Sequence, residues 1–296
     1  MKKHISGRSP FIFLTILTTL SVLLIILNYL IGMRIPFKVD FLIGFVGGLL
    51  IFVIWHAILT KGWRRSVLMF SLSFMIAFTA EALGVNFGLI FGNYHYTDVL
   101  GIGLFGVPFL AAITWEPILY AAFCMSDFLS PSAAAGNITW GKRLSSFLWL
   151  AVVGALATTA WDMMIDPIAV SQGWWVWEKG GAYVPYVANG VPITNFMGWL
   201  AVSFVIILLY RLIMLRGAPQ RHNMYLSVYG PLLLYAALFL TAFGVTLTVL
   251  RRPEVALIGL LAMGPFITIA LTHVNLLQHG QATSLSNMLP KTEKNS

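Results

Sequence analysis

Four acidic residues interrupt long apolar stretches of this sequence: Glu81, Glu116, Asp162 and Asp166. A carboxylate facing lipid at the centre of a membrane-spanning helix would cost roughly 3 kcal/mol on insertion scales. We therefore expect these side chains to face the interior of a helix bundle. A carboxylic acid that keeps its proton there is a potential proton donor. The four acids are the candidate catalytic residues.

Asp162 and Asp166 are four residues apart in the segment WDMMIDP, so they share one face of a helix. Two neighbouring carboxylates cannot both ionise easily, and one is expected to keep its proton. Asp162 is the deeper of the two, so we predict that it donates the proton and that Asp166 tunes it. The alternative is that the acids satisfy helix ends or pair with Trp and Tyr donors.

Prolines follow two of the acids directly: Pro117 after Glu116, and Pro167 after Asp166. A proline inside a helix removes a backbone donor and kinks the helix, which opens space beside the neighbouring acid.

Two segments rich in glycine and aromatic residues, 92–102 and 172–192, follow apolar runs that carry acids. Their composition predicts a folded cap above the acids, although single Trp residues could instead form an interfacial aromatic belt. Within 172–192, the aromatic residues are Trp174, Trp175, Trp177, Tyr183 and Tyr186.

The elements that must position these residues are membrane-spanning helices. Of the 296 residues, 59% are apolar and only 9% are charged, and the mean hydropathy is +0.86. A spanning helix needs about 20 mostly apolar residues. The sequence has eight such runs, at 11–31, 39–60, 66–91, 103–125, 144–170, 193–215, 226–250 and 255–277. We expect an all-α, polytopic bundle in one membrane domain, 1–279, followed by a polar and disordered tail, 280–296.

Basic residues orient the bundle. With the N-terminus inside, the outer segments hold only five of the 18 Lys and Arg residues, namely Arg34, Lys38, Lys179, Arg251 and Arg252. Cytoplasmic loops are enriched in Lys and Arg, so both termini are predicted to be cytoplasmic. The helix rise then places the acids at about 15 Å (Glu81), 18 Å (Glu116), 12 Å (Asp162) and 6 Å (Asp166) below the outer helix ends. Three helices would thus bring acids to a similar level.

Other classes of function have little support. The net charge of +8 does not form the basic face that nucleic-acid binding needs, so we expect no nucleic-acid partner. His56, His95 and His273 lack the spacings of metal-binding motifs, so no metal site is predicted. The sequence has no nucleotide-binding glycine motif and no CxxC, so no cofactor is predicted.

Several segments together are specific enough to suggest a family: FGNYHYTDVLGIGLFGVPF (91–109), WEPILY (115–120), TTAWDMMIDPIAVSQGWWVWEKGGAY (158–183) and GVPITNFMGW (190–199). They resemble the integral-membrane carotenoid biosynthesis family, which includes bisanhydrobacterioruberin hydratase and bacterial hydratases of carotenoid end groups. The resemblance is clearest over residues 80–200.

The resemblance implies acid-catalysed addition of water to the terminal double bond of an acyclic carotenoid, in the cytoplasmic membrane and without a cofactor. Partners would be the carotenoid, the bilayer and other enzymes of the same pathway. Aromatic faces could then stabilise a cation, and Glu81 and Glu116 could orient the attacking water or relay protons. The candidate substrate- or water-binding residues are Trp161, Trp174, Trp175, Trp177, Tyr183, Asn195 and Tyr94.

Two other classes stay open. The same acids and aromatic residues would serve another carotenoid step, such as cyclisation, isomerisation or assistance to a prenyl-elongating enzyme. Intramembrane acids and prolines would also suit a proton-coupled transporter, although no inverted repeat is visible.

Overall fold

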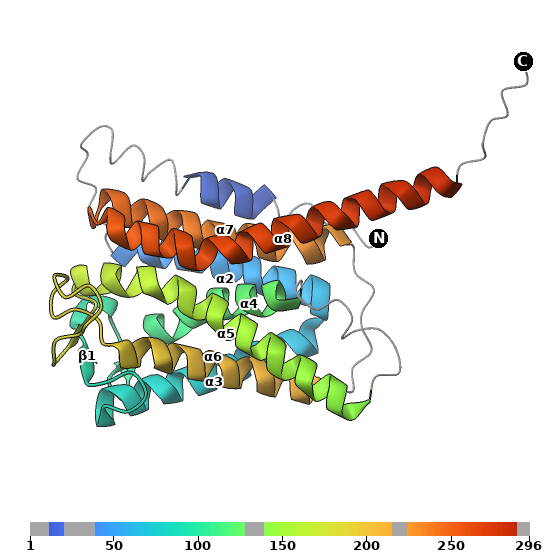
Figure 1. Ribbon diagram of the computed structural model, residues 1–296. Helices are drawn as coiled ribbons and strands as arrows, with labels where there is room; N and C mark the ends of the chain where they lie inside the picture. The colour runs from blue at the N-terminus through green and yellow to red at the C-terminus, as the bar shows by residue number, and fades with distance from the viewer. Residues whose placement is uncertain (1–11, 21–38, 128–138, 215–223, 289–296) are drawn as a thin grey trace, which may run out of the picture.

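The computed structural model describes residues 12–20, 39–127, 139–214 and 224–288. Within these ranges, seven helices are long and apolar enough to cross a membrane. They are α2 (Val39–Lys61), α3 (Trp63–Phe87), α4 (Phe109–Asp127), α5 (Trp140–Ser171), α6 (Ile193–Ile213), α7 (Met224–Thr248) and α8 (Pro253–Met288). The helices lie side by side along one direction (Figure 1). The protein is therefore an all-α, multi-pass membrane bundle, as the sequence predicts.

Both ends of the chain differ in detail from the expected spans. Of the first apolar run, 11–31, the described residues 12–20 are helical. Its remaining residues lie outside the described ranges, so an eighth span and cytoplasmic termini stay predictions. At the other end, α8 continues to Met288. The part of the expected tail from Gly280 to Met288 is thus helical, and 289–296 lie outside the description.

Helix α5 has the central position, because it packs against α4, α6, α7 and α8. The buried core runs along it: Ala151, Ala155, Ala157, Met164 and Ile168 are almost completely buried. Small side chains on α5 allow neighbouring helices to approach closely, as is common where helices associate in membranes.

The two aromatic segments form one cap at an end of the bundle. Strand β1 (Tyr94–Tyr96) pairs antiparallel with β4 (Trp175–Trp177), which places Tyr94 opposite Trp177 and Tyr96 opposite Trp175. Figure 1 shows β1 and the connecting loops at that end. We call residues 92–102 and 172–192 the cap. The pairing confirms the prediction of a folded cap.

The cap also contains the 3₁₀ helix η1 (Asp98–Leu100). Directly after its first segment comes a hairpin of β2 (Gly103–Leu104) with β3 (Val107–Pro108). The hairpin occupies the start of the predicted run 103–125, so α4 begins only at Phe109. Likewise, the predicted run 66–91 ends early: Gly88 has a φ of 66°, a left-handed conformation that commonly terminates helices.

These boundaries correct the depths estimated from the sequence. Glu81 lies six residues before the end of α3, and Glu116 seven residues after the start of α4. At the rise of an α-helix, these acids are about 9 Å and about 10 Å along their helices from the cap end, shallower than expected. The two aspartates are little changed, because α5 ends at Ser171, close to its predicted end.

Candidate functional site

Glu81 is held by three side-chain donors. Its Oε2 accepts hydrogen bonds from the hydroxyls of Tyr94 and Tyr96, the latter at 2.8 Å, and its Oε1 accepts one from Trp115 Nε1 at 3.0 Å. The side chain is 5% exposed. Each of the three neutral donors stabilises a negative charge on this buried carboxyl group, so together they offset part of the cost of ionising it away from water. One acceptor position on Oε1 is still available for a further donor.

Burial also affects the two tyrosines, which lie in the cap outside the spanning helices. Removal from water raises the pKa of Tyr94 and Tyr96 well above the usual value of a phenol, and the nearby charge of Glu81 is the second cause. Both hydroxyls therefore stay protonated and act as hydrogen-bond donors at any physiological pH.

Asp162 and Asp166 form a pair joined by Asn195. The Asn195 amide nitrogen, from α6, donates to Asp162 Oδ2 at 3.0 Å and to Asp166 Oδ2. All three side chains are buried, with Asp162 fully so. Because an amide carries two N–H hydrogens, one nitrogen can serve both carboxyl groups. Two carboxyl groups this close favour sharing a proton over carrying two charges.

Glu81 and Asp166 line the same polar cavity, between α3, α4, α5, α6 and the cap. The other lining residues are mostly aromatic or hydroxyl-bearing: Phe91, Tyr94, Tyr96, Ala111, Thr114, Trp115, Trp175, Trp177, Asn195 and Trp199. The centre of a water-sized sphere can move through about 30 Å³ of this cavity. One water needs about 10–15 Å³ by that measure, so the polar cavity can hold water.

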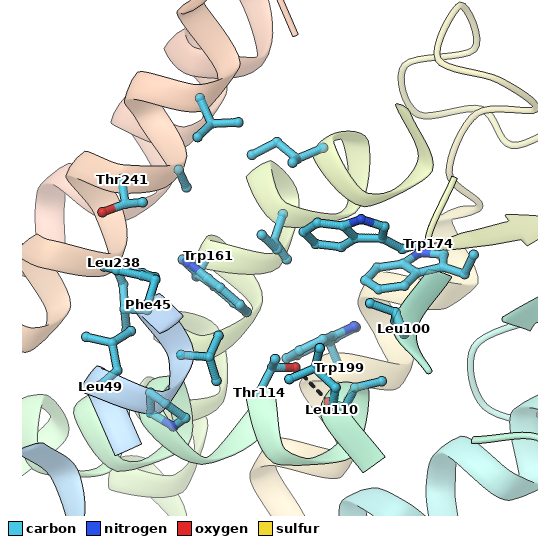
Figure 2. A pocket seen from close by; sticks show the side chains of 18 residues that line it. Phe45, Leu49, Leu100, Leu110, Thr114, Trp161, Trp174, Trp199, Leu238 and Thr241 are labelled. Carbon is cyan, nitrogen blue, oxygen red and sulfur yellow. Dashed lines mark hydrogen bonds between the residues drawn. The ribbon is translucent and has the colours of Figure 1, made fainter. Parts of the chain in front are cut away.

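An apolar pocket adjoins the polar cavity. It spans about 800 Å³, part of which is open to the surroundings of the protein. Side chains from α2, α4, α5 and α7 surround it (Figure 2). At the bundle side these include Phe45, Leu49, Leu238 and Thr241, and toward the cap Leu100 and Trp174. Four residues line both spaces: Ala111, Thr114, Trp175 and Trp199. The two spaces are therefore neighbours that share these side chains as a common wall.

Two stacked indoles lie between α4 and α6 where the two spaces meet. The rings of Trp115 and Trp199 lie 3.7 Å apart between centroids and are almost parallel, at 5°. Trp161 meets Trp199 edge to face, with centroids 6.2 Å apart. Electron-rich indole faces attract cations, and more strongly where water is excluded. The junction therefore suits a reaction that passes through a positively charged intermediate.

Comparison with known proteins identifies the family. Residues 40–265 match the family model described as carotenoid biosynthesis protein. The chain belongs to the carotenoid biosynthesis protein family. A relative, bisanhydrobacterioruberin hydratase from Haloarcula japonica, is 30% identical over 148 residues, which are 50% of this chain and 45% of the relative. The match thus spans less than half of the relative's length. No solved structure matches the chain.

The structure gathers most predicted binding residues of this carotenoid biosynthesis protein. Trp161 and Trp174 line the apolar pocket, and Trp175 lines both spaces. The polar cavity is lined by Tyr94, Trp177 and Asn195. Trp177 is 2% exposed and donates from Nε1 to the carbonyl oxygen of Phe91 at 3.3 Å, so it belongs to the core of the cap.

Tyr183 and Glu116 are placed elsewhere. The hydroxyl of Tyr183 donates to the Met163 carbonyl oxygen at 2.8 Å, which ties the cap to α5. Glu116 Oε2 accepts from Ser73 Oγ at 2.6 Å. Ser73 lies two helical turns further from the cap than Glu81 on α3. Neither Tyr183 nor Glu116 is among the described residues that line the two spaces, so the Glu116 carboxyl group does not join Glu81 and Asp166 in the polar cavity.

The two aspartates differ in their access to the polar cavity. Depth along the helix predicts Asp162 as the proton donor, but Asp166 is the one that lines the cavity. Both side chains are buried, and Asp162 is not among the described residues that line the cavity. The Asn195 amide contacts both carboxyl groups, so the difference comes from their positions along α5, where Asp166 lies about one turn nearer the cap. Across the described ranges, no three His, Cys, Asp or Glu side chains are grouped as a metal site would require.

Four site residues were not predicted: Tyr96, Trp115, Trp199 and Thr114. Tyr96 follows Tyr94 by two positions, and alternate residues of a strand share a face, so the YHY pattern carries this signal. The two tryptophans lie within the motifs WEPILY and GVPITNFMGW, but only packing shows that they stack. Nothing in the sequence marks Thr114.

Proposed function

We propose that this carotenoid biosynthesis protein adds water across the terminal double bond of an acyclic carotenoid, producing a tertiary alcohol within the membrane. One observation carries the proposal: a polar cavity lined by two carboxyl groups adjoins an apolar pocket lined by aromatic residues. The name of the 30% identical relative, a hydratase, supports the same chemistry. The cytoplasmic membrane, with both termini in the cytoplasm, is the location that the basic residues favour.

The apolar pocket would bind the end of the polyene. Its lining of Phe, Leu, Val and Trp side chains favours a hydrocarbon over any polar ligand. Because Trp175 and Trp199 line both the pocket and the polar cavity, the terminal double bond would lie beside these residues, where the two spaces meet. A lipid-soluble substrate could reach this site without leaving the bilayer.

Asp166 would protonate the alkene. The π electrons of the terminal double bond take the proton from the carboxyl O–H, and the more substituted carbon becomes a tertiary cation. Asp166 is the member of the aspartate pair that lines the polar cavity. Asp162, linked to it through Asn195, would share the proton and keep Asp166 protonated between turnovers. This assignment exchanges the roles that depth alone predicts for the two aspartates.

The indoles of Trp199 and Trp175 would stabilise the tertiary cation until water attacks it. A water in the polar cavity then forms the new C–O bond, and Glu81 takes the released proton through the free acceptor position on Oε1. The proton returns to Asp166 through the cavity that both acids line. Alkene and water are consumed, an alcohol is formed, and the acids end in their starting states.

The experiment is to express the chain in cells that make an acyclic carotenoid and to analyse extracted pigments by mass spectrometry. We expect a product heavier than the substrate by one water for each reacted end, and none with Asp166→Asn at equal membrane levels. A product of unchanged mass would instead indicate isomerisation or cyclisation. Unchanged pigments together with proton-dependent solute uptake would indicate a transporter. Either result would overturn the proposal.

A further inference from the structure

Thr114 lies where the apolar pocket meets the polar cavity. It is on the first turns of α4, five residues after Phe109. In the described part of the chain, it is the hydroxyl-bearing member of the four residues that line both spaces. The other three, Ala111, Trp175 and Trp199, offer methyl or indole surface. A polar atom at this junction can contact both the reacting carbon and the cavity water.

The hydroxyl of Thr114 is already committed as a donor. Its Oγ1 donates to the Ala111 carbonyl oxygen at 2.6 Å, the dashed line in Figure 2. A hydroxyl has one hydrogen and two acceptor lone pairs, so Oγ1 can only accept further hydrogen bonds. Such a group cannot protonate the alkene. It can accept a hydrogen bond from a water molecule and so fix its orientation.

We propose that Thr114 holds the attacking water, an inference that rests on the proposed hydration. The water would donate one hydrogen to Thr114 Oγ1 and the other to Glu81 Oε1. Both acceptors line the polar cavity, and this arrangement directs a water lone pair toward the junction. The cation forms at the junction from the apolar side. Thr114 would thus act on the second half of the reaction, after the proton has been transferred.

This placement determines what happens to the cation. With the water held, the cation gains a C–O bond and becomes the alcohol. Without it, the cation loses a proton from a neighbouring carbon to a base, and the electron pair of that C–H bond re-forms an alkene. In the second case the carbons exchange hydrogen with the solvent but gain no oxygen. Thr114 therefore sets the ratio of hydration to exchange.

The test compares Thr114→Val with Thr114→Ser in membranes incubated in deuterated water with an acyclic carotenoid. Valine keeps the shape of threonine and removes the acceptor, whereas serine keeps the acceptor. Mass spectrometry counts both oxygen gained and deuterium incorporated into remaining alkene. Thr159→Val is a matched control, because Thr159 makes the same kind of bond within α5, to Ala155 O at 2.9 Å, and lines neither space.

We expect Thr114→Val to lower alcohol formation about 10-fold, the effect of one lost hydrogen bond, while deuterium still enters the alkene. Thr114→Ser and Thr159→Val should keep the wild-type ratio. Equal hydration by Thr114→Val would overturn the inference and leave the proposed function intact. Loss of exchange and hydration together, at wild-type membrane levels and with Thr114→Ser active, would also overturn it, because Thr114 would then act on the protonation step. A wild-type protein that neither hydrates nor exchanges would instead refute the proposed function.

Discussion

Glu81 on α3 and Asp166 on α5 face one polar cavity with different hydrogen-bond environments. Glu81 accepts from three donors, whereas Asp166 interacts with Asn195, Trp175 and the second carboxyl group, Asp162. The three donors make a negative charge on Glu81 easier to hold than a second negative charge within the aspartate pair, which favours a shared proton. Two acids of the same chemical type are thereby suited to opposite tasks, one as a base and the other as a proton donor.

The roles within the aspartate pair can be separated by single substitutions. We expect Asp166→Asn to lower alcohol formation at least 100-fold, within the usual contribution of a general acid. Asp162→Asn should be milder, because Asp166 still lines the cavity and can bind a proton. The measurement is product per folded protein, with folding checked by detergent-solubilised size-exclusion profiles. A severe loss in Asp162→Asn with a mild one in Asp166→Asn would assign the donor to Asp162.

Glu81 and Glu116 provide a matched comparison of two buried glutamates on neighbouring helices. Glu81→Gln removes the proposed base and places an amide against three donors, so we expect a loss of about 100-fold in alcohol formation. Glu116→Gln changes a carboxyl group whose described partner is Ser73, outside both spaces, and should leave product formation within about two-fold. The reverse order of effects would move the reaction centre deeper into the bundle.

Trp177 tests whether the cap closes the site or only anchors in lipid. Its indole is buried and donates to the Phe91 carbonyl oxygen, so Trp177→Leu leaves a void and an unpaired acceptor. The unpaired acceptor alone costs about 1–3 kcal/mol. We expect a lower thermal midpoint and reduced product, with Trp177→Phe intermediate. Unchanged stability and activity in the leucine variant would show that the segment 172–192 is only an interfacial aromatic belt.

The membrane spans and the cap could be predicted from the sequence because both depend on local composition. Long apolar runs, basic loops and the aromatic segments 92–102 and 172–192 are local signals. Their pairing as β1 and β4 follows from the loops meeting at one end of the bundle. Helix ends were less accessible: 88–91 and 103–108 are apolar enough to continue a span. There, Gly88 and the β2–β3 hairpin end the helical conformation instead.

The acidic residues themselves could be predicted from the sequence, but their surroundings could not. Polarity inside apolar runs is enough to find Glu81, Asp162 and Asp166, and their spacing pairs the two aspartates. Which carboxyl group lines the cavity depends on how the other helices and the cap pack around α5, and no spacing within α5 reveals that packing or the contact of both aspartates with Asn195. For the same reason, Glu116 was expected beside the others, although its carboxyl group contacts Ser73.

Membrane orientation is a separate prediction. Thr97 and Lys179 flank the paired strands of the cap, so reporter fusions at both positions must give the same side. The distribution of Lys and Arg predicts that this side is outside and that Lys142 is inside. An inside signal at Lys179 would reverse the orientation and place the cap and the reaction on the cytoplasmic face.

The source of the oxygen tests the central claim most directly. Membranes containing the protein should be incubated with an acyclic carotenoid in heavy-oxygen water, and the product analysed by mass spectrometry. Hydration predicts one heavy oxygen atom at each newly formed tertiary alcohol, and no labelled product with Asp166→Asn. A modified carotenoid that contains no heavy oxygen would contradict the account.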